Sequence, residues 1–243
     1  MTGENPIIAI RDWSCGYLDE PIVVDFSFDL TRGTIACIVG SNGAGKSTLL
    51  RSIYGTIKRF KGELYFAGEQ IESLKPIERM ARGISFVPQG RCNFPYLSVA
   101  ENMQLAAHTL SKSQEKKAVE KQINRFPVIR NKWRERASNL SGGEQQMLEM
   151  AMAFVVEPTL LLIDEPSLGL SPKMRTEVFE TIRELAHDDL SIVMVEQNVR
   201  GGLAVSDTAI VMDLGRKVME GSPEEILADS RINSVFLGGS PHD

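Results

Sequence analysis

The stretch Thr34–Thr48, TIACIVGSNGAGKST, decides the fold. Its first six residues are almost all apolar, which is typical of a strand buried on both faces of a parallel sheet. The next nine residues satisfy the pattern G-x-x-x-x-G-K-[ST] and are followed by a segment expected to be helical from Lys46 to about Tyr54. In that pattern the backbone folds closely around phosphate groups and successive N–H groups point at the negative charge. The order of strand, loop and helix predicts a phosphate-binding loop, and an ordinary glycine-rich turn is the weaker interpretation.

This loop predicts a nucleotide site with ATP and Mg²⁺ as its cofactors. Lys46 is expected to reach the β- and γ-phosphates, and the Ser47 hydroxyl is expected to ligate Mg²⁺. The whole loop is expected to bind the nucleotide through Gly40, Ser41, Asn42, Gly43, Ala44, Gly45, Lys46, Ser47 and Thr48.

A second apolar strand ends in two adjacent acids, in the segment TLLLIDE at Thr159–Glu165. In an α/β sheet such a strand end lies beside the phosphate loop, so Asp164 is expected to hold Mg²⁺ through its water shell. The chain turns at Pro166, which lets Glu165 face the γ-phosphate as a general base for water. Two solvated acids capping a strand would be the alternative, but the apolar run before them and the upstream loop favour catalysis.

The rest of the pattern indicates how the chain is organised. Strands alternating with helices imply an α/β core, and Gly62–Phe66 with Glu69–Ile71 form an expected small hairpin. From about residue 91 to 155 helix formers dominate, which predicts a helical insert.

The composition argues against several functional classes. The 243 residues carry a net charge of −5, which argues against binding nucleic acid through a basic surface. Cys15, Cys37 and Cys92 lack the spacing of metal ligands or disulfides, so reduced thiols in a cytosolic protein are expected. The longest apolar runs are only strand-length, so any membrane role would depend on a partner.

The segment LSGGEQQ at Leu140–Gln146 opens an apolar helix. Ser141 and the N–H groups of Gly142 and Gly143 would lie at the helix N-terminus, where an anion can bind. A serine cap beside a glycine turn would explain the segment if it stood alone. Over seven residues, however, it closely resembles the signature motif of ABC-type ATPases. The resemblance implies that these three residues face the γ-phosphate held by another subunit, in a head-to-tail dimer with two nucleotides at its interface.

Three further positions resemble functional residues of that family. Gln89, in FVPQG, resembles the glutamine that contacts Mg²⁺ and the attacking water. Tyr17, in SCGYLDE, resembles the aromatic residue that stacks on adenine, although ordinary packing could also explain it. Gln197, in VEQN, stands where the family usually has a histidine that contacts the γ-phosphate. Its amide can donate a hydrogen bond but cannot carry a proton charge, so we hypothesise that Gln197 senses the γ-phosphate by hydrogen bonding. Ser171 replaces an aspartate that the family places at the subunit interface.

The resemblance covers Ile7–Gly239 and is closer to the ATPase subunits of bacterial importers for branched-chain and other hydrophobic amino acids. The residues that carry it are LSGGEQQMLEMA, LLLIDEPSLGLSP, MVEQN and FLGG. ATPases of urea importers share VPQGR and the following FP, so urea or short amides stay open as alternative solutes. The implied fold is an α/β P-loop NTPase core with a mainly parallel sheet, an N-terminal antiparallel β subdomain and a helical insert. A single domain over residues 1–243 is expected, with its core in 1–90 and 156–243 and a helical signature subdomain at about 91–155.

The resemblance also implies partners and a location. They are a second ABC ATPase subunit, identical or related, membrane permease subunits and, indirectly, a periplasmic solute-binding protein. The chain would act peripherally at the cytoplasmic face of the bacterial inner membrane. In Arg91–Leu97, RCNFPYL, the apolar and aromatic residues suit docking of a partner's helix, or a hydrophobic staple holding the insert to the core. The rival functions are a soluble ABC-type ATPase acting on nucleic acid or ribosomes, and a P-loop kinase.

Overall fold

The computed structural model describes residues 5–186 and 190–232. The larger sheet within these residues consists of β3 (Ile35–Gly40), β6 (Ile84–Val87), β7 (Leu160–Asp164), β8 (Ser191–Glu196), β9 (Thr208–Asp213) and β10 (Arg216–Gly221). Its strands lie in the order β10-β9-β3-β8-β7-β6, and only the pairing of β10 with β9 is antiparallel. The carboxyl ends of β3, β6, β7 and β8 therefore meet at one edge, where ligands bind in sheets of this type.

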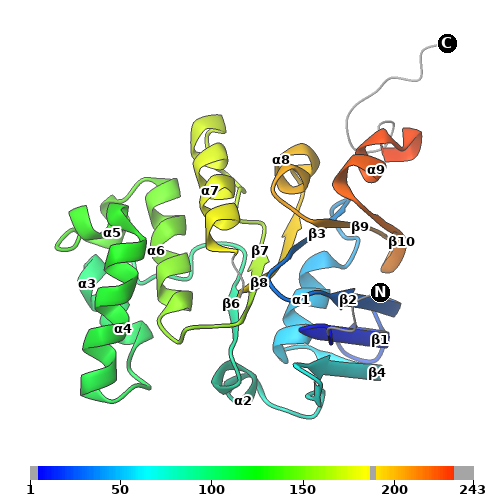
Figure 1. Cartoon of the computed structure of the whole chain (residues 1–243), viewed down its shortest axis with the longest axis horizontal. Coiled ribbons are helices and arrows are strands. Elements are labelled where there is room, and N and C mark those ends of the chain that lie inside the picture. The colour runs from blue at the N-terminus through cyan, green and yellow to red at the C-terminus, as the bar shows by residue number, and fades with distance from the viewer. Residues whose placement is uncertain (1–4, 187–189, 233–243) are drawn as a thin grey trace.

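A smaller sheet is built from β1 (Ile8–Gly16), β2 (Val23–Leu30), β4 (Lys58–Phe66) and β5 (Glu69–Gln70). Its order is β2-β1-β4-β5 and all its neighbours are antiparallel. The sheet lies beside α1 (Lys46–Tyr54), as Figure 1 shows. Trp13 Nε1 donates a buried hydrogen bond of 2.8 Å to Ser52 Oγ, which fixes β1 to this helix. The expected antiparallel N-terminal sheet and its hairpin are confirmed.

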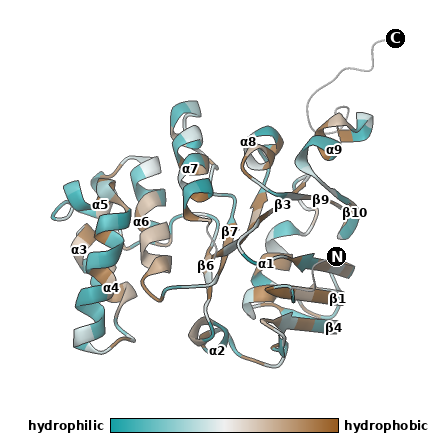
Figure 2. Ribbon diagram, viewed as in Figure 1, coloured by the Kyte–Doolittle hydropathy of each residue, from teal (hydrophilic) through white to brown (hydrophobic). Residues whose placement is uncertain are grey.

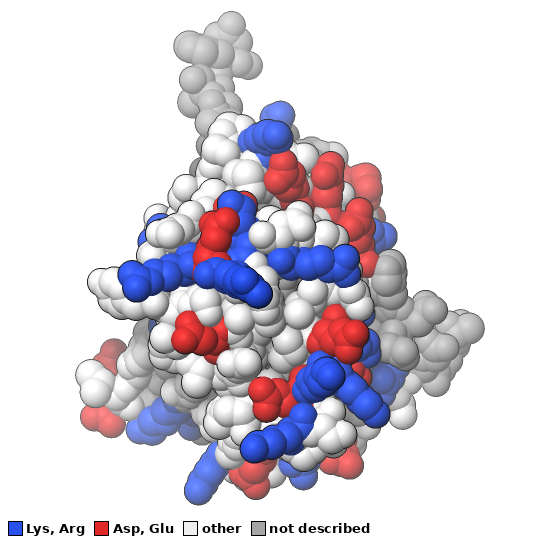
Figure 3. Space-filling view, turned by 90° about the vertical axis from the view of Figure 1, so that its left-hand side faces the viewer, with Lys and Arg blue, Asp and Glu red and all other residues white. Residues whose placement is uncertain are grey.

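Between β6 and β7, a stretch described throughout, the regular elements are all helical: α3 (Val99–Ala106), α4 (Lys112–Arg125), α5 (Pro127–Asn131), a 3₁₀ turn (Ala137–Asn139) and α6 (Gly142–Phe154). They stand together at one end of the molecule (Figure 1). In Figure 2 most of α4 is hydrophilic, in keeping with its position on the surface. Acidic and basic side chains are interspersed over this end (Figure 3). The proposed boundaries of a separate helical subdomain stay a prediction.

The other helices are α2 (Pro76–Ala81), α7 (Pro172–Leu185), α8 (Val199–Ala204) and α9 (Pro223–Ala228). No helix in the described part of the chain is long and apolar enough to cross a bilayer.

The side chains of β3 supply two apolar cores because successive residues of a strand point to opposite faces. Ile35, Cys37 and Val39 join a cluster with residues of α3, α6 and α7. Ala36 and Ile38 join a second cluster with α1 and the smaller sheet. All six residues of β3 are buried, as the apolar run predicts. The phosphate loop is thus anchored to a strand packed on both sides.

The structure adds elements that the sequence pattern did not predict. The β10 segment RKVMEG has no fully buried residue, which suits an edge strand but gives little apolar signal. The short helices α2 and α8 were also missed. The predicted bounds of α1 are confirmed, whereas the FLGG segment at 236–239, which carries part of the resemblance, lies outside the described residues.

Candidate active site

The phosphate loop, Gly40–Thr48, turns the chain from the carboxyl end of β3 into α1 (Figure 1). The buried Lys46 folds back over this loop, and its Nζ donates to the carbonyl oxygens of Gly40 (2.8 Å) and Ser41 (3.1 Å). Gly45 has a φ of 91°, which glycine adopts at little cost. A Cβ on Gly40 would lie 2.3 Å from the Met212 carbonyl oxygen. Glycine is therefore required at Gly45 by its backbone conformation and at Gly40 by the close approach of the Met212 carbonyl oxygen.

Acidic residues surround the ammonium group of Lys46. Burial lowers the pKa of Lys46, while Glu165, Asp164 and Glu196 oppose that effect. A lysine ammonium is a compact charge that suits phosphate oxygens. The site therefore places a positive charge at the loop where the β- and γ-phosphates are expected.

Ser47 and Asp164 form the oxygen-rich side of the site. Ser47 Oγ donates to Asp164 Oδ1 at 2.7 Å, joining the start of α1 to the end of β7. The other oxygen, Oδ2, is buried without a hydrogen-bond partner, and Arg51 Nη2 lies 3.9 Å from it. Burial raises the pKa of Asp164. A buried carboxylate oxygen without a donor and an adjacent hydroxyl fit a hard divalent cation such as Mg²⁺.

Glu165 is held by two side-chain amides from the segments that follow β6 and β8. Gln89, two residues beyond β6, donates from Nε2 to Glu165 Oε2 at 2.8 Å. Gln197, directly after β8, donates from Nε2 to both carboxylate oxygens at 2.8 Å. Glu165 has a φ of 51°, an uncommon conformation for a residue with a side chain, and its N–H bonds to Val195. This turn separates the carboxylate from that of Asp164 and directs it between the two glutamines.

Glu196 is a functional candidate that the sequence analysis missed. It is 1% exposed, and its carboxylate accepts bonds from the N–H and hydroxyl of Ser167 (2.9 and 3.0 Å) and from the N–H groups of Gln197 (3.1 Å) and Asn198 (3.2 Å). Burial raises the pKa of Glu196 and these hydrogen bonds oppose the shift. Glu196 thus joins the segment after Glu165 to the one that presents Gln197. The sequence signal that could have pointed to Glu196 is an acid at the end of a strand that is otherwise almost entirely apolar.

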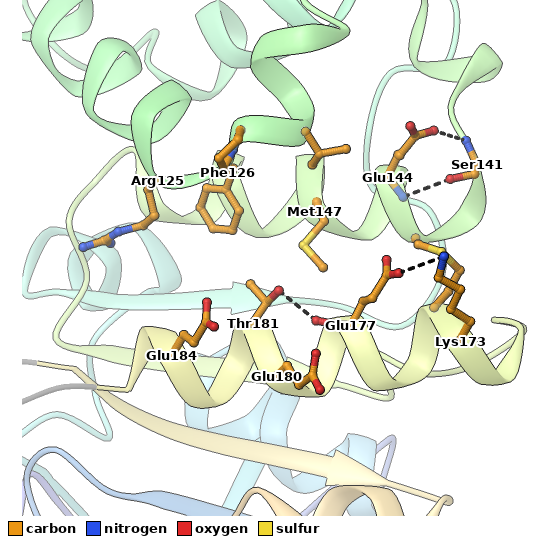
Figure 4. Close-up of a pocket in the computed structure, with 14 residues that line it drawn as sticks. Arg125, Phe126, Ser141, Glu144, Met147, Lys173, Glu177, Glu180, Thr181 and Glu184 are labelled. Carbon is orange, nitrogen blue, oxygen red and sulfur yellow. Dashed lines mark hydrogen bonds and ion pairs between the residues drawn. The ribbon is translucent and has the colours of Figure 1, made fainter.

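Ser141 caps α6, and its hydrogen bonds lie within the first turn of that helix. Its Oγ accepts from Glu144 N at 3.3 Å, and its own N–H donates to Glu144 Oε2 at 2.7 Å (Figure 4). Gly143 is close to α7, since a Cβ there would lie 1.8 Å from Met174 Cε. A groove of about 520 Å³ lies beside this contact and is lined by both helices and by the junction of α4 and α5. Its rim includes Ser141, Glu144, Lys173, Glu177, Glu180 and Glu184.

The structure of one chain leaves α6 and the phosphate loop apart, as their separate positions in Figure 1 show. It brings together Lys46, Ser47, Asp164, Glu165, Gln89 and Gln197. It does not bring Ser141, Gly142 and Gly143 to that group. The catalytic and binding roles assigned to all of these residues stay predictions.

Tyr17 lies in the turn after β1, and 44% of its surface is exposed. The end of this turn and the start of β2 pack on the phosphate loop. A Cβ built on Gly45 of the loop would lie only 3.0 Å from Val23 Cγ2 and 3.5 Å from Ile22 Cγ2. An open ring on a turn beside the loop is compatible with stacking on a base. Ser171 caps α7 through its hydroxyl.

The fold and this site define a P-loop ATPase. A model of the ABC transporter family matches residues 23–168, which is more than half of the chain. The chain therefore belongs to the ABC transporter family. The ATP-binding proteins of this family bind ATP and hydrolyse it to drive transport.

Several curated relatives match over nearly their whole length. A probable branched-chain amino acid transport ATP-binding protein, LivF of Archaeoglobus fulgidus, is 38% identical over 93% of this chain and 96% of its own. The high-affinity branched-chain amino acid transport ATP-binding protein BraG of Pseudomonas aeruginosa is 36% identical over 88% and 92%. The lipopolysaccharide export system ATP-binding protein LptB of Escherichia coli is 31% identical over 95% and 97%.

Solved structures share the fold. CbiO1 of Clostridium perfringens, described as part of the ABC transporter complex cbiONQ, superposes with a TM-score of 0.84 at 25% identity, over 97% of both chains. An ATP-binding cassette of an ABC transporter in its ADP conformation gives a TM-score of 0.86 at 22% identity, over 97% of this chain and 100% of the other. The predicted ABC ATPase fold is confirmed.

Proposed function

We propose that this chain is the ATPase subunit of an importer for branched-chain or other hydrophobic amino acids. Support comes from LivF and BraG, which are named for branched-chain amino acid transport and are 38% and 36% identical to it. The LptB relative, named for lipopolysaccharide export, is more distant at 31%. An ATPase subunit does not touch the solute, so the proposed substrate is inferred from these relatives and not from residues of the site.

The placement of Glu165 between two glutamine amides carries the proposed chemistry. Glu165 accepts a proton from the attacking water, whose oxygen bonds to the γ-phosphorus while the bond to the β–γ bridging oxygen breaks. Gln89 and Gln197 orient the base and water, and Lys46 neutralises charge on the β- and γ-phosphates. The products are ADP and inorganic phosphate.

Mg²⁺ is the cation proposed for this site, held by Ser47, Asp164 and Gln89. When bound, it would neutralise charge on the β- and γ-phosphate oxygens. Ser47 Oγ and Asp164 Oδ2, which accepts no hydrogen bond, are the atoms that favour such an ion. Tyr17 is proposed to stack on the adenine base.

A second ATPase subunit, identical or related, is proposed to complete each nucleotide site. Ser141 and the N–H groups of Gly142 and Gly143 would donate to the γ-phosphate across the interface. The separation of α6 from the phosphate loop within one chain supports this arrangement.

Permease subunits are proposed to dock on the loop that carries Phe94 and Tyr96, whose side chains are 51% and 81% exposed. Aromatic side chains exposed in a loop suit contact with a partner's helix. The chain would then lie at the cytoplasmic face of the inner membrane, and a periplasmic binding protein would deliver the solute. The interspersed charges in Figure 3 and the net charge of −5 offer no support for a nucleic-acid partner.

Uptake by the reconstituted transporter tests this proposal. The chain is assembled in lipid vesicles with permease and solute-binding subunits from its source organism. We expect ATP-dependent uptake of labelled leucine with the wild-type chain and none with Glu165→Gln. Uptake of urea without leucine would overturn the proposed substrate, and leucine uptake undiminished in Glu165→Gln would overturn the proposed chemistry.

A further inference from the structure

Gln89 is followed by a segment, Gly90–Leu97, that leads from β6 into α3; we call it the connecting loop. Its first half is held by a buried carboxylate from the middle of α6. Glu149 is 3% exposed, and its Oε1 accepts bonds from Cys92 N (2.9 Å), Asn93 N (3.3 Å) and Asn93 Nδ2 (2.7 Å). The loop is thereby bonded to α6 three residues after Gln89.

The second half of the loop is held in the same manner by Asn102 of α3. Asn102 is fully buried; its Oδ1 accepts from Phe94 N at 2.7 Å, and its Nδ2 donates to the carbonyl oxygens of Phe94 (3.1 Å) and Ser98 (2.9 Å). Both anchors belong to helices and neither to the central sheet. The connecting loop is therefore attached to the helical end of the molecule, although it begins at a strand.

A buried carboxylate is a costly means of holding a loop. Burial raises the pKa of Glu149, and the hydrogen bonds from Cys92 and Asn93 oppose that shift. Buried charges are tolerated when hydrogen bonds satisfy them, and bonds to a charged acceptor are stronger than bonds to a neutral one. Glu149 consequently gives a firmer anchor than a neutral acceptor would.

Glu149 also lies on α6, the helix that Ser141 caps, about two turns beyond that residue. We infer that Glu149 is a positioning residue: it fixes the connecting loop to α6, so that the position of this helix sets how Gln89 meets Glu165. The inference rests on the proposed function, because it assigns a consequence to the contact between Gln89 and the base. Glu149 itself touches none of the reacting groups.

The first test measures anchoring without nucleotide and without turnover. Cys92 is exposed whereas Cys15 and Cys37 are buried, so alkylation of the native protein by iodoacetamide reports on Cys92. The Cys92 side chain is open to the reagent, but the packing around its sulfur, followed by the charge of Glu149, raises the pKa of the thiol to about 12, which slows the reaction because the thiolate is the nucleophile. We expect Glu149→Gln to be alkylated severalfold faster than wild type, since removing the charge lowers the thiol pKa and raises the thiolate fraction. Glu149→Leu should react at least as fast because it also releases the loop.

Gln122→Leu is the matched control. Gln122 is fully buried on α4 and its Nε2 donates to the Phe154 carbonyl oxygen at the far end of α6, so its loss breaks a buried polar contact of the same helix. We expect Cys92 in this variant to react at the wild-type rate. An unchanged rate in Glu149→Gln, or an equal increase in Gln122→Leu, would overturn the inference.

The second test is steady-state ATP hydrolysis by the assembled transporter. We expect kcat to fall about tenfold in Glu149→Leu and less in Glu149→Gln, which can still accept through its amide oxygen, with KM for ATP within about twofold of wild type. Gln122→Leu should keep the wild-type kcat. If Glu149→Leu does not fold, the kcat of Glu149→Gln is the test. A wild-type kcat in every Glu149 variant that folds would overturn the inference.

These outcomes are separate from failure of the proposed function. Wild-type hydrolysis by Glu165→Gln would remove Glu165 as the base, yet the alkylation rates would still show whether Glu149 holds the loop.

Discussion

The edge of the sheet and the N-terminus of α6 are both predicted to bind the γ-phosphate, but they are organised differently. At the sheet edge Ser47 is bonded to Asp164, and Glu165 to Gln89 and Gln197, so side chains from different elements already meet. At α6 the Ser141 hydroxyl bonds only within the first turn of its helix among the contacts described, and that turn borders a groove with α7. One chain thus assembles the binding and base groups, while α6 offers a surface that another subunit can use. Mutations in the two regions should therefore differ in whether they impair binding or hydrolysis.

The largest effect is expected from Glu165→Gln, which removes the base but preserves the shape of the residue. We predict a fall in ATP turnover of about 1,000-fold, within the range for loss of a general base, with ATP affinity of the isolated chain largely retained. Phosphate release and equilibrium ATP binding measure the two quantities. Turnover within tenfold of wild type would remove Glu165 from its role.

Lys46→Ala should impair both binding and hydrolysis, because it removes the charge at the phosphate loop. We predict a loss of turnover of about 100-fold and clearly weaker ATP binding by the isolated chain, since charge-assisted bonds to phosphate are among the strong ones. Titration with a fluorescent ATP analogue checks binding. Normal affinity would show that Lys46 does not face the nucleotide.

Ser141→Arg tests the other side of the comparison. We predict that hydrolysis by the assembled transporter falls about 100-fold, as expected when an oxyanion donor is lost. ATP binding by the isolated chain should stay at the wild-type level, because α6, which Ser141 caps, lies apart from α1 and the phosphate loop of its own chain. A matching loss of affinity in the isolated chain would contradict the separation of the two regions.

A smaller effect is expected from Gln197→Ala. It removes one of the two amides bonded to Glu165, a hydrogen bond to a charged group, so we predict about tenfold slower hydrolysis in the assembled transporter. The steady-state kcat is the measurement. Unchanged turnover would refute the hypothesis that Gln197 reports on the γ-phosphate.

Local sequence predicted the parts of the site that depend on adjacent residues. The apolar run before Gly40 and the pattern through Thr48 indicated a buried strand, a loop and a helix, and the bounds of α1 agree with that prediction. The apolar strand ending at Asp164 similarly indicated two carboxylates beside the loop. These features could be predicted because strand burial and loop shape leave direct marks on residue type.

Contacts between distant segments could not be predicted in the same way. Glu149 lies in the otherwise apolar stretch 147–154 of α6 and bonds to residues 56 and 57 positions earlier, so periodicity carried no sign of its partner. Glu196 was quoted within a motif, but only the fold shows that it joins Ser167 to Gln197 and Asn198. The edge strand β10 was missed because its residues are polar or only half-buried.

The mass of Glu165→Gln at saturating Mg-ATP tests the central claim most directly, namely that the sheet edge of one chain is completed by α6 of another. In this variant ATP should stay bound and hold two chains together. Light scattering during size-exclusion chromatography should then give twice the 26.9 kDa of one chain, and Ser141→Arg added to the same variant should return the mass to that of one chain. A single-chain mass for Glu165→Gln with ATP demonstrably bound, both alone and when mixed with a related ATPase subunit of the same transporter, would contradict the claim.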